Sequence, residues 1–498
     1  MRRLVRSTAL LGVGSAATIV AAILRAKILA ALLGPQGTGV IAQLSTLTAV
    51  LVPLATLGMG NGVIAMIAEA RSRGDLLLVR RIHATSLTLS LLVGVLLAIL
   101  AALASPWLTD AIYHDRAWMW VVLVGVATVP LSAIGSLRTT LLQGHEAVSG
   151  MAGLNAIVAA VGVASIVPLA WFFGLKGAVL QLLVVAGAYV LVSGWLLRPH
   201  VPKALEREAA GPPPPRIDRS LLRPLLRYGS SALVVGLSST LTLLVLRSVL
   251  VSKLGLPQNG IYQVCVGISG LYMPLILNSI TAVLWPQIAA QKEDEEIRKT
   301  MRDGVRLAFL LMTAATGAML AGAPIWIPLF YSGKFLPALD LLPIQFLGDY
   351  FRTAAWMFGI WLVPKNWLRP WVLFDIAYGV VMIVAFWLLV DRIGLRSVVF
   401  AYVAAHVTHA ALHYFLARRS LGFRLGPDNR RLLLASFALL LGLATWTPRN
   451  PLGVALGLAA LAAWATLVVR SDEWRAGLRR ARQFGSALTG AHIRGDRN

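Results

Sequence analysis

Three arginines stand inside apolar stretches of the chain, where a charged side chain is costly: Arg25, Arg247 and Arg352. A lone cation in hydrocarbon costs about 2.5–3.5 kcal/mol on insertion scales, so such a side chain should face protein, water or an anion and not lipid. We therefore expect Arg25 and Arg247 to line an internal cavity. The alternative is that their long side chains reach the membrane interface.

Two carboxylates occur in the same apolar part of the chain. Asp349 precedes Arg352 by three residues, so the two side chains share one helical face and can form an ion pair. In the alternative interpretation, Arg352 shares an anionic ligand with Arg25. Asp375 is either a carboxylate that couples transport to a cation or a partner for a neighbouring helix.

Three histidines, His406, His409 and His413, share one helical face with Tyr402 because they are three and four residues apart. No nearby acidic or cysteine ligand completes a metal site, which leaves a proton-sensitive patch or ordinary packing. The chain has no phosphate-binding loop, dinucleotide fingerprint or nucleophile elbow. The sequence thus predicts no catalytic residue, no cofactor and no metal.

An internal repeat places Arg25 and Arg247 at equivalent positions. The pairs are Gly14 with Gly236, Thr18 with Thr240 and Arg25 with Arg247, displaced by 222 residues, and Gly34 with Gly255, Gly39 with Gly260 and Pro53 with Pro274, displaced by 221. We predict two related halves that each turn a cationic helix face toward a shared interior. Pro53 and Pro274 should kink equivalent helices, unless neighbouring groups satisfy the carbonyls that they free.

The composition is that of an integral membrane protein. Of the 498 residues, 58% are hydrophobic and 13% are charged, and the mean hydropathy is +0.75. The net charge of +24 does not indicate nucleic-acid binding, because the basic residues cluster in alternate loops, as membrane topology requires. The single cysteine, Cys265, excludes an intramolecular disulfide.

Apolar runs predict an all-α polytopic protein with about 14 transmembrane helices. The predicted spans are 7–32, 38–68, 82–104, 117–142, 149–170, 174–197, 221–251, 257–289, 304–330, 336–364, 368–390, 395–417, 431–447 and 451–470. Six spans form each of two pseudo-symmetric lobes, and the last two are additions outside the repeat. The predicted units are an N-lobe at 1–197, a proline-rich linker at 198–220, a C-lobe at 221–418, extra helices at 419–470 and a basic tail at 471–498.

The distribution of Lys and Arg predicts the orientation. Most of the 45 basic residues fall on the side of the N-terminus, which predicts that both termini, the linker and the tail are cytoplasmic. Because six is an even number, the two lobes have the same orientation. They should be related by a pseudo-twofold axis along the membrane normal, the parallel-repeat case.

The segment from Leu24 to Arg71 resembles the polysaccharide-transporter branch of the multidrug/oligosaccharidyl-lipid/polysaccharide exporter superfamily. It is most similar to the O-antigen and common-antigen translocases. The resemblance rests on a basic residue before LLGPQGTG (Leu32 to Gly39) and on LATLGMGNGV (Leu54 to Val63). Elsewhere it rests on the six-plus-six repeat and the two extra spans.

The resemblance implies two lobes around a central cavity that opens alternately to either side of a bacterial inner membrane. The implied substrate is an undecaprenyl diphosphate-linked oligosaccharide, an O-antigen or exopolysaccharide unit, flipped from the cytoplasmic to the periplasmic leaflet. Related flippases carry a cavity arginine that matches Arg25. Guanidinium groups bind phosphate well, so Arg25, Arg247 and Arg352 would hold the diphosphate. The candidate sugar-facing residues are Thr18, Thr240, Gln43 and Asn61.

Membrane lipids are implied partners, and a polysaccharide polymerase and a chain-length regulator are candidate protein partners. A cation-coupled exporter of small molecules is the alternative function, with Asp349 and Asp375 as its coupling carboxylates. An enzyme is the least favoured interpretation, because every predicted outer loop is short. The identity of the glycan and the coupling ion stay open.

Overall fold

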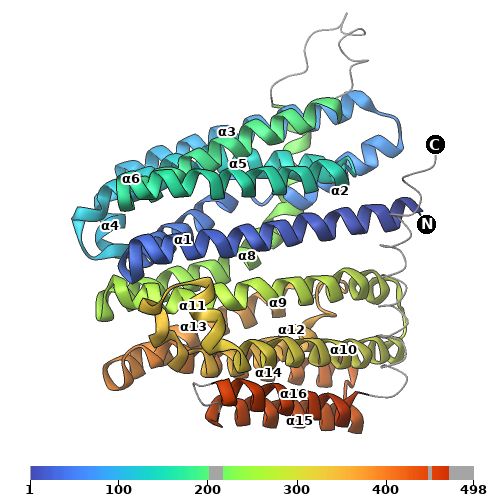
Figure 1. Cartoon of the computed structure of the whole chain (residues 1–498). Coiled ribbons are helices and arrows are strands. Elements are labelled where there is room, and N and C mark those ends of the chain that lie inside the picture. Colours follow the sequence, from blue (N-terminus) through green and yellow to red (C-terminus); the bar gives the residue numbers. More distant parts are fainter. Residues whose placement is uncertain (1, 201–216, 447–450, 470–498) are drawn as a thin grey trace, which may run out of the picture.

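The computed structural model describes residues 2–200, 217–446 and 451–469, and all of the regular structure in these ranges is helical (Figure 1). The N-terminal elements are α1 (Arg2–Ala55), α2 (Gly60–Ser72), α3 (Leu76–Leu103), α4 (Ser105–Tyr113), η1 (Arg116–Trp118), α5 (Met119–Gly144), α6 (Val148–Leu197) and η2 (Arg198–His200). The later elements are α8 (Arg219–Leu254), α9 (Leu256–Ala290), α10 (Asp294–Ala321), α11 (Ala323–Phe330), η3 (Gly333–Asp340), α12 (Leu342–Gly359), α13 (Leu368–Ile393), α14 (Arg396–Leu421), α15 (Pro427–Trp446) and α16 (Pro451–Val468).

Two helices are each made of two segments. α1 has 54 residues and α6 has 50, whereas about 20 residues cross the apolar layer of a bilayer. Each is interrupted by a glycine with positive φ, Gly34 at 63° and Gly174 at 56°, a conformation that glycine adopts without strain. The chain turns back at these points, so each helix supplies two antiparallel segments (Figure 1).

The same glycine turns recur in the second half of the chain. Gly255, with φ 86°, separates α8 from α9, and Gly394, with φ 55°, separates α13 from α14. Gly255 is the predicted counterpart of Gly34, and Gly394 stands 220 residues after Gly174. The short helices α4 and α11 also occupy equivalent places at one end of the bundle. The predicted arrangement of two related lobes is therefore confirmed.

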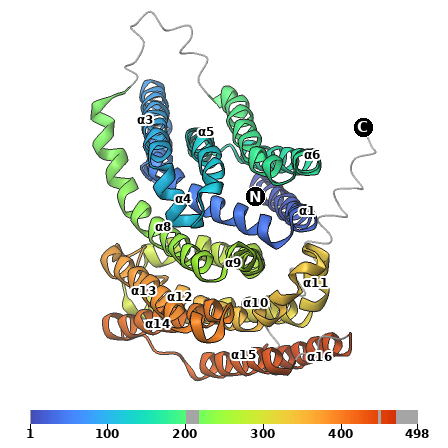
Figure 2. The same ribbon diagram turned by 90° about the vertical axis from the view of Figure 1, so that its left-hand side faces the viewer.

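The lobes form two stacked layers (Figure 2). α1–α6 make the N-lobe and α9–α14 make the C-lobe, and α15 and α16 pack on the outer side of α10. α8 links the layers, because its contacts run from α2 in the N-lobe to α13 in the C-lobe. Its start is fixed to α3, since the Asp218 amide donates to Thr85 Oγ1 at 3.0 Å and Arg81 pairs with the Asp218 carboxylate at 3.7 Å.

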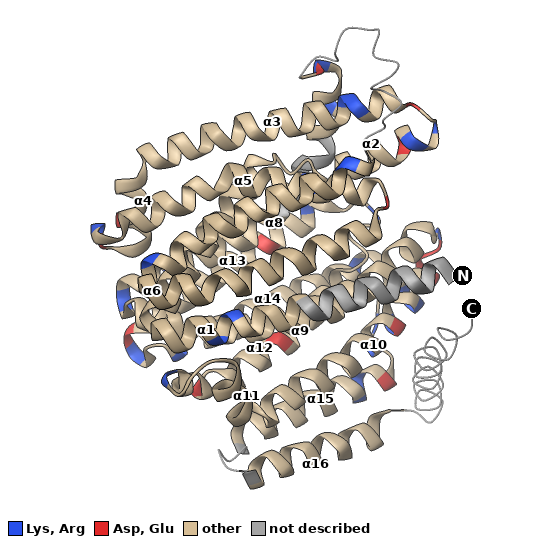
Figure 3. Cartoon of the chain, turned by 45° about the horizontal axis from the view of Figure 1, so that its top comes forward, with Lys and Arg blue, Asp and Glu red and all other residues tan. Residues whose placement is uncertain are grey.

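The apolar lengths of the helices make this a multi-pass membrane protein. Within the described ranges, nine helices are long and apolar enough to cross a bilayer, and α1 and α6 each provide two segments. α12, α15 and α16 fall outside that set, so the total of about 14 spans stays a prediction. Charged side chains lie mainly at helix ends (Figure 3). Most of the predicted linker and the tail at 471–498 lie outside the described residues.

The two predicted proline kinks differ from each other. α1 ends at Ala55, two residues after Pro53, and the chain resumes as α2 after a turn with positive φ at Leu57 and Gly58. α9 continues unbroken through Pro274. The prediction of equivalent kinks is wrong at this point, because only the first proline is followed by a turn that the chain can close.

The lobes touch most closely where α1 crosses α9. A Cβ atom on Gly39 would lie 2.1 Å from the carbonyl oxygen of Leu256, and one on Gly260 would lie 1.9 Å from that of Pro35. These two contacts are related by the repeat. Asn259 Nδ2 also donates to the Gly39 carbonyl oxygen at 2.9 Å. We call this crossing the α1–α9 seam, and it closes the lobes together at the end that carries α4 and α11.

The seam predicts the effect of a single methyl group. Gly39→Ala should open the seam, because overpacking against a fixed backbone carbonyl costs about 1–3 kcal/mol. Spin labels at Asp115 and Lys334, which are exposed on opposite lobes near this end, would report the separation by pulsed electron resonance in a Cys265→Ser background. The distance distribution should move to longer values.

Gly187→Ala is the matched control, since a Cβ at this helical glycine meets nothing within 4 Å. Equal distance distributions for Gly39→Ala and the unmodified protein would contradict the close backbone approach at the seam.

Candidate functional site

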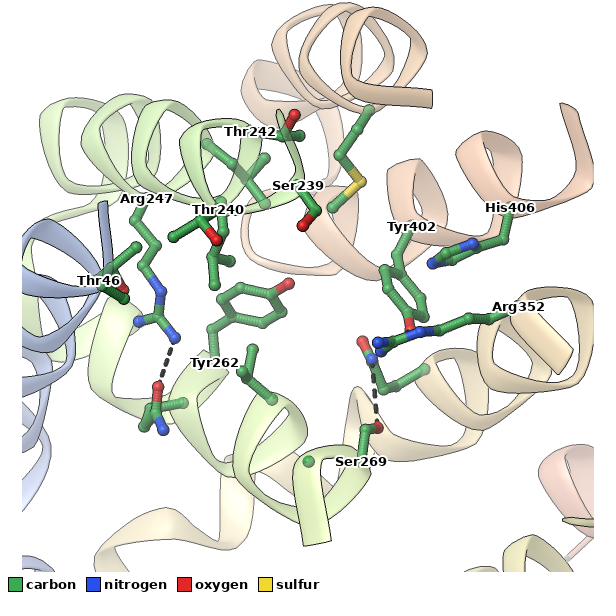
Figure 4. A pocket seen from close by; sticks show the side chains of 18 of the residues that line it. Thr46, Ser239, Thr240, Thr242, Arg247, Tyr262, Ser269, Arg352, Tyr402 and His406 are labelled. Atoms are coloured by element: carbon green, nitrogen blue, oxygen red, sulfur yellow. Dashed lines mark hydrogen bonds between the residues drawn. The ribbon is translucent and has the colours of Figure 1, made fainter. Parts of the chain in front are cut away.

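A cavity of about 950 Å³ lies between the lobes, and it is built mainly by the C-lobe. The N-lobe contributes only α1, whereas α8, α9, α12, α13 and α14 supply nearly all of the remaining lining. The three arginines predicted to line a cavity all do so. Figure 4 shows Arg247 and Arg352 reaching in from opposite sides.

Arg25 projects from the first segment of α1. Its Nη2 donates to Gln181 Oε1 at 3.1 Å, and its Nε is buried without a hydrogen-bond partner. Gln181 is held in turn, since its amide nitrogen donates to the Gly162 carbonyl oxygen at 3.0 Å. This glutamine orients the guanidinium but leaves its positive charge unneutralised.

Arg247 is almost fully enclosed, with 1% of its surface exposed. Its Nη1 donates to Asn259 Oδ1 at 2.7 Å and its Nη2 donates to Gln263 Oε1, while its Cζ lies 5.6 Å from the centre of the Tyr262 ring. All of these partners are neutral. Because Asn259 also bonds Gly39, Arg247 is linked directly to the α1–α9 seam.

Arg352 and Asp349 do not form the direct ion pair that their spacing allows. Tyr402 lies between them: its hydroxyl donates to Asp349 Oδ1 at 2.8 Å, and Arg352 Nη1 donates to that hydroxyl oxygen at 3.4 Å. Asp349 has no exposed surface and accepts two further bonds, from Ser269 Oγ at 2.6 Å and Tyr272 Oη at 2.5 Å. The carboxylate is thus occupied beneath the cavity wall, and Arg352 keeps its charge facing the cavity.

The charge balance of the lining favours an anion. Among the lining residues, Asp375 is the one acidic side chain, against the three arginines. Its nearest charged partner is His409, whose Nε2 lies 3.4 Å from Asp375 Oδ1, and not an arginine. In a low-dielectric site such a surplus of positive charge is compensated most effectively by a ligand with negative charge.

The predicted sugar-facing residues are divided by the structure. Thr240 lines the cavity, with its hydroxyl donating to the Gly236 carbonyl oxygen at 2.9 Å. Thr18 lies on α1 with an exposed side chain and is not among the lining residues.

Gln43 and Asn61 do not face the cavity. Gln43 has no exposed surface, and its amide nitrogen donates to the Ile112 carbonyl oxygen at 3.1 Å and to Ser248 Oγ at 3.2 Å. It therefore ties α1 to α4 and α8. Asn61 is exposed at the start of α2, because the chain turns between α1 and α2.

Sequence reasoning missed the neutral partners of Arg247 and the aromatic side chains of the wall. Asn259 occupies the repeat position of Thr38, so the repeat offered a signal for it. Tyr262 and Gln263 follow on the next helical turn and had no such signal. The aromatic lining also includes Trp285, Trp356, Trp371 and Tyr378.

The histidines His406, His409 and His413 line the cavity along α14. The described residues contain no group of three or more histidine, cysteine or acidic side chains placed to hold a metal ion. The interpretation of these histidines as a metal site therefore has no support from the geometry.

The buried carboxylate should be important for stability. Asp349→Ala leaves three hydroxyl groups unpaired and removes the negative charge nearest to Arg352, so we expect a loss of about 3 kcal/mol or more. Thermal unfolding in detergent would measure it. Asp391→Ala is the matched control, because Asp391 is 70% exposed and pairs with Lys253 at the surface, where such a pair contributes about 0–1 kcal/mol. Equal shifts in the two variants would contradict the role given to Asp349.

The comparisons with known proteins begin with a family model described as polysaccharide biosynthesis protein, which matches residues 28–340, more than half of the chain. The chain is also similar to the lipid III flippases of Escherichia coli (strain K12) and Shigella flexneri. It is 26% identical to each over 398 residues, covering 79% of this chain and 92% of the relative.

Two solved structures have the same fold. The lipid II flippase MurJ, in an inward closed conformation, aligns with a TM-score of 0.70 at 10% identity over 93% of this chain and 98% of its own. A multidrug resistance MATE family transporter of the MOP superfamily, in an inward-facing conformation, aligns with a TM-score of 0.67 at 19% identity over 81% of this chain and 94% of its own. At these identities the likeness concerns the fold alone.

Proposed function

The chain belongs to the polysaccharide biosynthesis protein family, and on that premise we propose that it flips a lipid-linked oligosaccharide across a bacterial inner membrane. The observation that carries the proposal is the convergence of Arg25, Arg247 and Arg352 on one cavity without matching carboxylates. The resemblance to lipid III flippases supports the same class of substrate.

The headgroup is the part of the substrate that the arginines fit. A diphosphate presents several negatively charged oxygens, and planar guanidinium groups bind such oxygens with two parallel hydrogen bonds. Arg25 and Arg352 are the better placed donors, because Arg25 Nε has no partner and Arg352 makes one long bond to Tyr402. Arg247 adds charge while it stays bound to Asn259 and Gln263.

The sugars would occupy the rest of the cavity. Its volume and its indole and phenol side chains suit a ligand of several rings, since such side chains combine an apolar face with a polar edge. The polyprenyl chain would remain in the bilayer, where its burial needs no protein cavity. Undecaprenyl diphosphate as the carrier, and an O-antigen or exopolysaccharide unit as the glycan, are the finer parts of this proposal.

Transport would proceed by alternating access. The α1–α9 seam closes one end, and the cavity wall extends toward the other end, where Trp285 lies near the end of α9 and Trp371 near the start of α13. α1 starts at this second end (Figure 1). With a cytoplasmic N-terminus, the described state is therefore loaded from the cytoplasm, and opening the seam releases the glycan on the periplasmic side.

The alternative, a cation-coupled exporter of small organic cations, is less well supported. Its cargo would have to enter a cavity with three arginines and one carboxylate, and like charges repel strongly in such a site. Of its two predicted coupling carboxylates, Asp349 is already held by three hydroxyl groups.

Transport of a fluorescent undecaprenyl diphosphate oligosaccharide in proteoliposomes tests the proposal. Arg25→Gln removes a charged donor, so we expect transport at subsaturating substrate to fall roughly 10- to 150-fold, which corresponds to about 1.5–3 kcal/mol. Arg25→Lys keeps the charge and loses the fork, and it should give an intermediate rate.

Arg138→Gln is the control, because Arg138 is an intramembrane arginine that bonds the Val190 carbonyl oxygen at 2.6 Å and lies off the cavity. Equal rates for Arg25→Gln and Arg138→Gln would remove Arg25 from the site. Transport of a cationic dye, with none of the oligosaccharide lipid, would favour the exporter.

A further inference from the structure

The histidines of α14 form a continuous column with Tyr402. Ring centres are 4.4 Å apart for Tyr402 and His406, 6.3 Å for His406 and His409, and 4.4 Å for His409 and His413. The column lines the cavity along its length, and through the Tyr402 hydroxyl it ends on Asp349. The proposed flippase function does not use these histidines.

The ring nitrogens of this column are incompletely paired. His406 is 5% exposed, and neither of its ring nitrogens has a hydrogen-bond partner. His409 Nε2 is within ion-pair distance of Asp375 but makes no hydrogen bond. Buried polar atoms are usually paired, so unpaired nitrogens that face a cavity are expected to have a partner there in another state of the protein.

We propose that His406 and His409, with Asp375, form a proton-binding site that is thermodynamically linked to anion binding in the cavity. Protonation turns an imidazole into a cation with two N–H donors. At His409 the added proton converts the contact with Asp375 into an ion pair. At His406 it supplies donors that an anion in the cavity can accept.

The charges around the column determine the direction of the linkage. α12 and α13 pack against α14, and the titratable or charged groups that they turn toward it are Asp349, Arg352, Asp375 and Tyr378, beside Tyr402 of α14 itself. Arg352 acts electrostatically on both His406 and His409. Without an anion, its positive charge opposes a second cation. A bound anion cancels that charge, so proton and anion binding favour each other.

The linkage predicts a pH-dependent affinity. Protonated histidine gives tighter anion binding, so the gain is complete at low pH and is lost as the pH rises through the titration of the anion-bound form. By reciprocity, anion binding takes up protons. The inference relies on the proposed function only for the identity of the anion, an isoprenoid diphosphate.

The experiment measures binding of undecaprenyl diphosphate to the full chain in nanodiscs between about pH 5.5 and 8, the range in which histidine titrates. The ratio of the affinities at the two pH limits should be about fivefold or more larger for the unmodified protein than for His406→Gln/His409→Gln. Asp375→Asn should lower the ratio in the same direction. Titration of the lipid phosphate itself cancels, because every variant meets the same ligand.

His83→Gln is the matched control: His83 is a buried histidine of the N-lobe, 2.9 Å from His145 and off the cavity, and its ratio should equal that of the unmodified protein. NMR of labelled ring nitrogens gives a second readout, in which His406 or His409 gains a proton when the lipid binds.

The outcomes separate the two proposals. Equal ratios in the unmodified protein and the double variant, with both rings neutral in the bound state, would overturn the proton site even if oligosaccharide transport is intact. A ratio that falls as expected, in a protein that transports no oligosaccharide lipid, would uphold the proton site and overturn the flippase.

Discussion

The constraint on which this structure depends is the cost of keeping guanidinium charges inside a membrane protein without carboxylates to neutralise them. Each cavity arginine is instead held by neutral oxygen atoms: Gln181 for Arg25, Asn259 and Gln263 for Arg247, and the Tyr402 hydroxyl for Arg352. Neutral dipoles solvate a charge but leave its field intact. The helices that carry these partners, α6, α9 and α14, therefore have to pack around the cavity, and the field that remains is what an anionic headgroup can use.

The same polar contacts connect the cavity to the closure of the lobes. Asn259 accepts from Arg247 with its oxygen and donates to the Gly39 carbonyl with its nitrogen, so one amide belongs both to the binding site and to the α1–α9 seam. Separating the lobes at the seam breaks the second contact and frees the amide to turn. A ligand that draws Arg247 away from Asn259 changes the same group from the other side. Reciprocity then requires that substrate binding and seam opening influence each other.

Much of this arrangement was predictable from the sequence, because costly residues carry strong signals. The repeat of Gly34 as Gly255 fixed the two turns, and the apolar context of the three arginines placed them on a cavity. Moderately polar residues carry weaker signals. Gln43 and Asn61 were expected at the cavity, but polarity alone does not indicate which way a helix is rotated. The spacing of Asp349 and Arg352 likewise allowed a direct pair, and Tyr402 separates them from a helix whose position only the fold determines.

The two lobes are equivalent in backbone but not in chemistry. Applying the displacement of Gly174 and Gly394 to α14 places Ala186, Tyr189 and Ser193 where the C-lobe has His406, His409 and His413. Arg138 and Thr139 resemble Arg352 and Thr353 as a pair, yet Arg138 bonds the Val190 carbonyl inside the N-lobe. The N-lobe thus contributes one cationic helix to the cavity, and the C-lobe contributes the charges, the titratable column and most of the wall. A ligand held mainly by one lobe moves with it, so what must change between states is chiefly how α1 meets α8 and α9.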